Sequence, residues 1–306
     1  MHIWQGTDSL TVPIPASTLA IGSFDGVHQG HCTLISAAVK NAQYFGRPSI
    51  VFTFDRHPAE FISPDTFPGY LTTPQQRMDL ISDLGVDHLV IAHFNWNFRE
   101  TDPETFLRDT LVNQLGAQAI YVGEDFRFGK NQAGDIAYLQ EAQERMGFKL
   151  NTVSLVQING EKAASRHIRQ LLMQGDIVGA NKILGHRYSL SGIVDEGQHI
   201  GRTIGYPTAN LRLGFPQVTP ADGIYATWAH WQGGKWKGAT SIGKRPTVKG
   251  KTRTIETYLM GFSGNLYGAP LDVEFVERIR EERKFSSLDE LKKQIALDVL
   301  AVEERL

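Results

Sequence analysis

Short apolar runs alternate with amphipathic segments over the first 184 residues. Five runs, at residues 18–24, 49–54, 88–94, 119–122 and 150–156, are apolar at successive positions. Runs that are apolar on both faces favour buried parallel strands over half-exposed antiparallel ones. The segments between them carry helical spacing, as at residues 31–45, where the apolar positions fall on one stripe. The pattern predicts a doubly wound α/β domain with a parallel sheet, which binds ligands at the carboxyl ends of its strands.

From residue 187 onward the period changes from helical to alternating. Strand-like segments lie at residues 187–195, 223–231, 235–242, 253–262 and 271–278. Gly233-Gly234 marks a tight hairpin, and Ser287 with Glu290 forms a capping box for a last helix. The pattern predicts an antiparallel barrel or sandwich closed by a helix. Because residues 166–184 keep helical periodicity, we expect one domain at residues 1–186 and a second at 187–306.

The composition mainly excludes certain partners and certain kinds of site. The chain has 306 residues, which suits two domains, and a formal net charge of −2. That charge, with no basic stripe, disfavours a nucleic-acid partner. The one cysteine, Cys32, excludes an internal disulfide and a cysteine metal cluster. With no long apolar run and no signal peptide at the N-terminus, we expect a cytoplasmic protein without a membrane partner, as a monomer or weak homo-oligomer.

The most informative segment is the turn after the first predicted strand. It leads into His28 and His31, which stand three apart at the start of a helical pattern and so share one face. A helix N-terminus there offers free N–H groups to a phosphate, and Gly26 and Gly30 let a triphosphate approach. This arrangement resembles the HxGH signature of nucleotidylyltransferases. The alternative is a βα turn with two solvated histidines.

Three further segments of this domain carry candidate residues. Phe54, Phe126 and Phe128 follow predicted strands and would stack on a flat ring, whereas aromatic residues there can also be core plugs. Asp125 would accept a hydrogen bond from a ribose or a ring amine. Arg169, near the start of a helix, would neutralise a pyrophosphate leaving group; the alternative is a surface arginine.

In the second domain the glycine-rich stretch at residues 197–210 stands out. Gly197, Gly201 and Gly205 are spaced four apart, with Arg202 among them, and their N–H groups would cover a phosphate chain. The alternative is a glycine-rich surface flap.

The oxygen-bearing side chains that follow suit a magnesium–phosphate site. Thr208 and Asn210 stand two apart in an extended segment and are hard oxygen ligands for Mg²⁺. Glu256 lies in an alternating strand, where it faces the side opposite to Ile255 and Thr257. A carboxylate near a phosphate site is a suitable base for a substrate hydroxyl, whereas alone it would be a solvent-facing residue.

Together these segments resemble the bifunctional prokaryotic riboflavin kinase/FAD synthetase family over nearly the whole chain. Residues 24–31, 53–58 and 123–129 match its adenylyltransferase motifs in order, and residues 201–211 match its kinase signature. Four further motifs follow in register, at residues 242–247, 256–259, 262–268 and 280–288.

The resemblance implies a Rossmann-like nucleotidylyltransferase domain and a kinase barrel. The barrel would phosphorylate riboflavin to FMN with ATP, with Glu256 as the base. The first domain would adenylylate FMN to FAD and release pyrophosphate, with His28, His31 and Arg169 as catalytic residues. The implied binding residues are Gly22, Phe24, Asp25, Gly30, Asp125 and Ser165 for ATP in the first domain; Phe54, His57, Pro58 and Phe128 for flavin; Gly201, Arg202, Gly205 and Pro207 for phosphate in the kinase; and Thr208 and Asn210 for Mg²⁺.

One motif departs from the family pattern. The family has a Ser-Ser-Thr-Arg-Ile-Arg-like stretch where this chain reads Ala164-Ser-Arg-His-Ile-Arg169. The loss of two hydroxyls removes candidate hydrogen bonds to ATP phosphates. One alternative is therefore a riboflavin kinase with a degenerate adenylyltransferase domain. Another is a non-catalytic flavin- or nucleotide-responsive module, which would not need a base or metal ligands.

Overall fold

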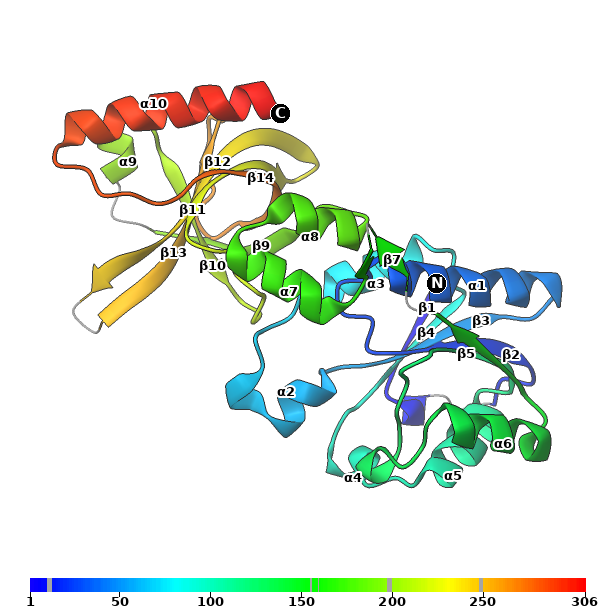
Figure 1. Cartoon of the computed structure of the whole chain (residues 1–306). Helices are drawn as coiled ribbons and strands as arrows, with labels where there is room; N and C mark the ends of the chain where they lie inside the picture. Colours follow the sequence, from blue (N-terminus) through cyan, green and yellow to red (C-terminus); the bar gives the residue numbers. More distant parts are fainter. Residues whose placement is uncertain (10–12, 155, 159, 197–199, 248–249) are drawn as a thin grey trace. The chain divides into compact units, whose positions relative to one another are not determined.

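The computed structural model describes residues 1–9, 13–154, 156–158, 160–196, 200–247 and 250–306 (Figure 1). It divides into two compact units. The N-terminal unit comprises Met1–Pro68 and Pro74–Ala164, and the C-terminal unit comprises Gly69–Thr73 and Ser165–Leu306. The helices after Ala164 are thus grouped with the barrel by their contacts, and the domain boundary at residues 186/187 stays a prediction.

The N-terminal unit is built on a parallel sheet of six strands in the order β1-β4-β3-β2-β5-β6. The strands are β1 (His2–Gln5), β2 (Ser17–Ile21), β3 (Ser49–Phe54), β4 (His88–Ala92), β5 (Ala117–Gly123) and β6 (Lys149–Val153). All five residues of β2 are buried, as a central parallel strand requires. The predicted parallel sheet is confirmed, and β1 is an addition to it.

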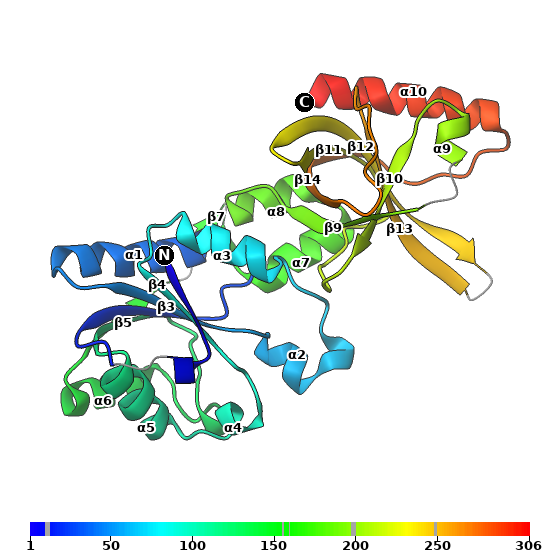
Figure 2. The ribbon, with the colours of Figure 1, turned by 180° about the vertical axis from the view of Figure 1, so that it is seen from behind.

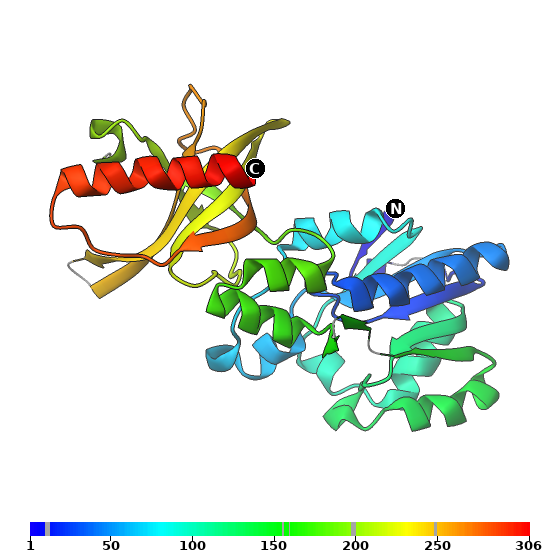
Figure 3. The same ribbon diagram turned by 45° about the horizontal axis from the view of Figure 1, so that its top comes forward.

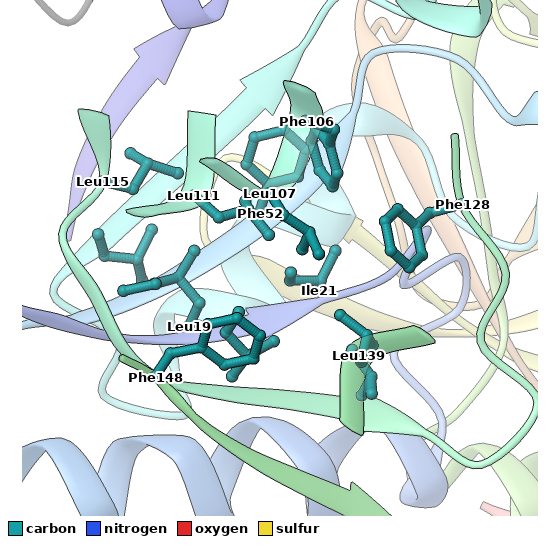
Figure 4. Packing of buried hydrophobic residues seen from close by; sticks show 14 of the residues in the cluster. Leu19, Ile21, Phe52, Phe106, Leu107, Leu111, Leu115, Phe128, Leu139 and Phe148 are labelled. Atoms are coloured by element: carbon teal, nitrogen blue, oxygen red, sulfur yellow. The ribbon is translucent and has the colours of Figure 1, made fainter. Parts of the chain in front are cut away.

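Helices cover both faces of this sheet (Figures 1 and 2). Along β2, Ala20 packs with α1 (Gln29–Tyr44) and α3 (Pro74–Ser82) on one face. Leu19 and Ile21 point to the other face, toward the π-helix Phe106–Gln114 and α6 (Ile136–Met146) (Figure 4). This alternation gives the doubly wound arrangement. The shorter elements of the unit are η1 (Thr7–Ser9), α2 (Pro58–Ile62), η2 (Pro64–Thr66), α4 (Trp96–Arg99), α5 (Pro103–Thr105), η4 (Lys130–Gln132), β7 (Gln157–Ile158) and β8 (Glu161–Lys162).

The C-terminal unit contains a closed antiparallel barrel in the order β10-β13-β12-β11-β14-β9 (Figure 3). The strands are β9 (Ser189–Asp195), β10 (Thr208–Leu213), β11 (Gly223–Trp231), β12 (Gly234–Thr247), β13 (Gly250–Leu259) and β14 (Pro270–Arg280). Antiparallel pairing of β9 with both β10 and β14 closes the ring. Of the two architectures predicted, the barrel is confirmed.

Local signals account for the ends of several elements in this unit. Gln232 and Gly233 both have positive φ, as a two-residue type I′ turn requires, and they join β11 to β12. The last helix, α10 (Leu288–Arg305), begins where Ser287 Oγ accepts a hydrogen bond from the Glu290 N–H at 3.2 Å.

The helical periodicity at residues 166–184 is confirmed, and the structure divides this segment. It is two helices, α7 (Ser165–Gln174) and α8 (Ile177–Leu184), because Gly175 has a φ of +83° and Asp176 caps α8. A short helix, α9 (Ile200–Thr203), precedes β10.

Candidate active sites

The turn between β2 and α1 holds the two histidines against each other. His28 is the N-cap of α1, is 5% exposed, and its Nδ1 accepts a hydrogen bond from the His31 N–H at 3.3 Å. With Nδ1 accepting, the neutral ring carries its proton on Nε2. The His28 and His31 rings stack with centroids 3.6 Å apart. The alternative of two solvated histidines is wrong.

The backbone of this turn is strained. Phe24 and Val27 have φ values of 49° and 38°, although both side chains are buried. Such conformations cost about 1–3 kcal/mol each and are typical of functional turns. The Phe24 ring packs edge-on against His31 at 5.2 Å. A Cβ on Gly30 would come within 3.1 Å of the His28 ring, so any side chain there would crowd that ring.

His31 is electrostatically unusual. Burial, with a smaller electrostatic contribution from the neighbouring His28, holds the His31 pKa well below its ordinary value. Its Nδ1 is buried and has no hydrogen-bond partner among the residues that the structure describes. His31 is therefore neutral near pH 7, with a ring nitrogen that protein groups leave unsatisfied.

A cavity of about 580 Å³ lies at the carboxyl ends of the central strands. It brings together four of the predicted residues, Phe54, Pro58, Asp125 and Phe128, with Phe126. The predicted flavin residue His57 is not among its lining residues. His57 instead caps α2, accepting a hydrogen bond from the Ala59 N–H at 3.1 Å, and stacks on Phe67.

Sequence reasoning missed part of this cavity wall. Phe94, Phe98, Arg99 and Phe106 also line it. Phe94 and Phe98 follow β4, and Phe54 is the last residue of β3, so all three come at or after the carboxyl end of a strand. The same rule that selected Phe54 would have found them.

Two predicted adenylyltransferase residues belong to the C-terminal unit. Arg169 is 7% exposed, and its Nε donates a hydrogen bond to the Gly69 carbonyl at 2.8 Å. The alternative of a surface arginine is wrong. Ser165 is the first residue of α7. The remaining predicted ATP residues, Gly22 and Asp25, lie in the turn after β2, where Asp25 is buried.

Strand register assembles the polar residues of the barrel. Asn210 on β10 lies directly opposite Glu256 on β13, and Thr208 lies opposite Tyr258. The intervening Ala209 and Thr257 are buried, so the polar side chains share the outer face. Thr208 Oγ1 donates a hydrogen bond to Glu256 Oε2 at 3.4 Å. The predicted alternation around Glu256 is confirmed.

These oxygens fit a hard divalent cation that shares its shell with phosphate. A hydroxyl, an amide and a carboxylate come together, and they supply neutral as well as charged oxygen donors. Among the described residues there is no group of three or more histidine, cysteine or acidic side chains able to hold a metal alone. The arrangement therefore suits Mg²⁺ that arrives with a nucleotide.

The glycine-rich segment leads into this face. A Cβ on Gly201 would stand 2.3 Å from the Tyr206 carbonyl oxygen, and Gly205 has a φ of +88°, so both positions require glycine. Gly197 and the Arg202 side chain lie outside the described part of the chain. A cavity of about 340 Å³ follows, lined by Pro207, Thr208 and a loop that includes Phe262, Asn265 and Tyr267.

Comparison with known proteins adds independent findings. The family described as FAD synthetase matches residues 14–167, and the family described as riboflavin kinase matches residues 184–306. The chain belongs to the bifunctional riboflavin kinase/FMN adenylyltransferase family. A protein of that name from Escherichia coli is 36% identical over 306 residues, covering 99% of this chain and 97% of its own. One from Haemophilus influenzae is 35% identical over 300 residues, covering 98% and 97%.

A solved structure shares the whole fold. It is titled a macrolide-efflux protein from Streptococcus pneumoniae, is 29% identical, covers 99% of each chain and has a TM-score of 0.89. Both catalytic domains of the family are thus present in one chain, which is an enzyme. This favours the bifunctional prediction over a kinase with a degenerate first domain.

No helix in the described part of the chain is long and apolar enough to cross a membrane.

Proposed function

We propose that adenylyl transfer takes place at the turn after β2 and phosphoryl transfer on the outer face of the barrel. The enzyme then converts riboflavin to FMN at one site and FMN to FAD at the other. The observation that carries this proposal is the pairing of Asn210 with Glu256 on adjacent strands, beside Thr208. It brings a base and hard oxygen ligands from separate motifs to one face.

Adenylyl transfer needs alignment more than acid–base help. An oxygen of the FMN phosphate attacks the α-phosphorus of ATP, the bond to the β-phosphate breaks, and pyrophosphate leaves. The nucleophile is already an anion, so the protein must position it and stabilise the charge moving onto the leaving group. The Nε2–H of His28 and the N–H groups at the start of α1 donate to phosphate oxygens there. The unsatisfied Nδ1 of His31 gains a partner once ligand is bound.

The aromatic cavity suits the flavin ring. Its wall offers Phe54, Phe126 and Phe128, whose faces stack on a planar tricyclic system. Ile21, the last residue of β2, also lines it. The cavity therefore adjoins the strand that leads to the histidine turn. The roles of Ser165 and Arg169 toward ATP stay predictions.

Phosphoryl transfer requires a base at the hydroxyl. The ribityl 5′-oxygen attacks the γ-phosphorus of ATP, the bond to the β-phosphate oxygen breaks, ADP leaves, and Glu256 takes the hydroxyl proton. Thr208 and Asn210 would hold Mg²⁺, which when bound offsets negative charge on the phosphates. Gly201, Gly205 and Pro207 shape the segment that covers them.

The location, partners and oligomeric state that we propose for the enzyme follow from its substrates and its charge. ATP and free flavins are intracellular metabolites, which supports a cytoplasmic location. The chain offers no basic stripe for nucleic acid, and small molecules are its partners. A monomer or a weak homo-oligomer is sufficient, because the described residues of each unit already bring a candidate site together.

Two substitutions test the division of labour. Glu256→Gln should lower FMN formation from riboflavin by at least about 100-fold and leave FAD formation from supplied FMN unchanged. His31→Asn should do the reverse. Both are followed chromatographically with ATP and Mg²⁺.

Matched controls use residues of the same types away from both sites, the half-buried Glu277 and the exposed His2. Glu277→Gln on β14 and His2→Asn on β1 should leave both activities intact. Equal loss of both activities in either test variant would contradict the assignment of separate sites.

A further inference from the structure

The cavity wall holds an arginine whose hydrogen-bond donors are unused. Arg99 ends α4, and its guanidinium carbon stands 4.8 Å from the centre of the Trp96 ring. The neighbouring Glu100 pairs with Lys130 at 2.8 Å. No hydrogen bond or ion pair joins the Arg99 guanidinium to any residue that the structure describes. Stacking on Trp96 therefore orients the planar fork and leaves its N–H groups for a ligand.

The sheet order places Arg99 at the far end of the cavity from the histidine turn. The cavity is lined by residues that end or follow β4, β3, β2 and β5, which are adjacent in that order. His28 and His31 follow β2, whereas Arg99 follows β4, two strands away. At about 4.8 Å per strand this is roughly 10 Å. A ligand with its phosphate at the histidines and its body across the cavity reaches Arg99 with its opposite end.

This inference rests on the proposed function, in which FMN occupies the cavity. The flavin ring carries two carbonyl oxygens on its pyrimidine edge, away from the ribityl phosphate. The phenylalanine side chains of the wall offer these oxygens no hydrogen bonds, whereas Thr101, Asn131 and Gln132 offer neutral donors and Arg99 a charged, forked one. We propose that Arg99 donates hydrogen bonds to the pyrimidine-edge carbonyl oxygens of the flavin ring. Arg99 would then determine the specificity of this site for the flavin ring.

Two other arginines nearby are less suited to this role. Arg56 lies over the Phe61 ring at 5.8 Å but does not line the cavity. Arg127 lines the cavity, but its Nη1 donates to the Phe126 carbonyl at 3.0 Å and the side chain is exposed. Arg108, which is exposed and does not line the cavity, provides an arginine control outside the motifs.

The test compares Arg99→Met with Arg108→Met in the full chain. Two quantities are measured in FAD formation: the KM for FMN, and the inhibition constant of lumiflavin, which has the ring but no phosphate, against FMN. Loss of charged hydrogen bonds to the ring should raise both by the same factor, about tenfold or more. Arg108→Met should change neither, and FMN formation from riboflavin should be unchanged in both variants.

The other outcomes separate the possible failures. A higher KM for FMN with an unchanged lumiflavin constant would show that Arg99 binds the phosphate, and would overturn the proposal. Phe54→Leu tests the cavity itself. If it raises both constants and Arg99→Met raises neither, the cavity binds flavin and the role of Arg99 is wrong. If neither variant changes either constant, the flavin assignment of the proposed function fails as well.

Discussion

At the scale of single residues, a short turn holds the stacked His28 and His31 side chains in place. The sequence indicates two histidines at helical spacing after a strand, and that was enough to predict a phosphate site. It does not show that Phe24 and Val27 take positive φ, or that Gly30 makes room for the His28 ring. Those features depend on packing around the turn. Spacing alone therefore singles out the two histidines as candidates but does not report their burial.

Burial of His31 has a consequence for stability. Its pKa is lowered in the folded protein, whereas in the unfolded chain it is about 6.5. As the pH falls from about 6.5 toward the folded-state pKa, the unfolded chain takes up the proton first, so stability decreases. Well above pH 6.5 neither state is protonated, and this contribution is constant.

Replacement of His31 by asparagine should therefore reduce the loss of stability on acidification. Urea unfolding of the parent and of His31→Asn at pH 8 and pH 5.5 measures this. The free energy of unfolding should fall less in the variant. An equal decrease in both proteins would show that the His31 pKa is not lowered in the fold.

At the scale of elements, strands were easier to predict than helix ends. The predicted buried runs correspond to β2 through β6, because a strand buried on both faces must be apolar throughout. β1 was missed because its four residues are mostly exposed at the sheet edge. Helical periodicity over residues 166–184 does not show where α7 ends and α8 begins, on either side of Gly175. Periodicity does not report a left-handed glycine between two helices.

The attachment of α10 to the barrel depends on a buried ion pair that no local pattern indicates. Arg280 on β14 donates to both carboxylate oxygens of Asp298, at 2.8 and 2.6 Å, and Asp298 is 5% exposed. Removing one partner leaves a buried charge uncompensated.

We expect Asp298→Ala to lower the free energy of unfolding by about 3–5 kcal/mol. Arg305 and Glu277 form a second, more exposed ion pair between α10 and β14, at 3.2 Å. Glu277→Ala should cost no more than about 1 kcal/mol. Urea denaturation of the two variants compares them, and equal losses would show that the Arg280–Asp298 pair has no special role in attaching the helix.

On the scale of the whole molecule, the chain joins a parallel sheet and a closed barrel, each with its own candidate site. Composition and period indicated both architectures. Register could not be predicted, since the opposition of Asn210 and Glu256 depends on how the barrel closes. The aromatic cavity was likewise only partly foreseen, because residues after four different strands must meet to form it.

The most direct test of the account is a chromatographic assay of the intact protein with Mg²⁺ and ATP, supplied with either riboflavin or FMN. The account predicts FAD from both substrates, with FMN appearing first from riboflavin. That result would show that Ala164, Arg166 and His167 are compatible with adenylylation. Accumulation of FMN from riboflavin, with no FAD from FMN, would contradict the account and leave a riboflavin kinase joined to an inactive first domain.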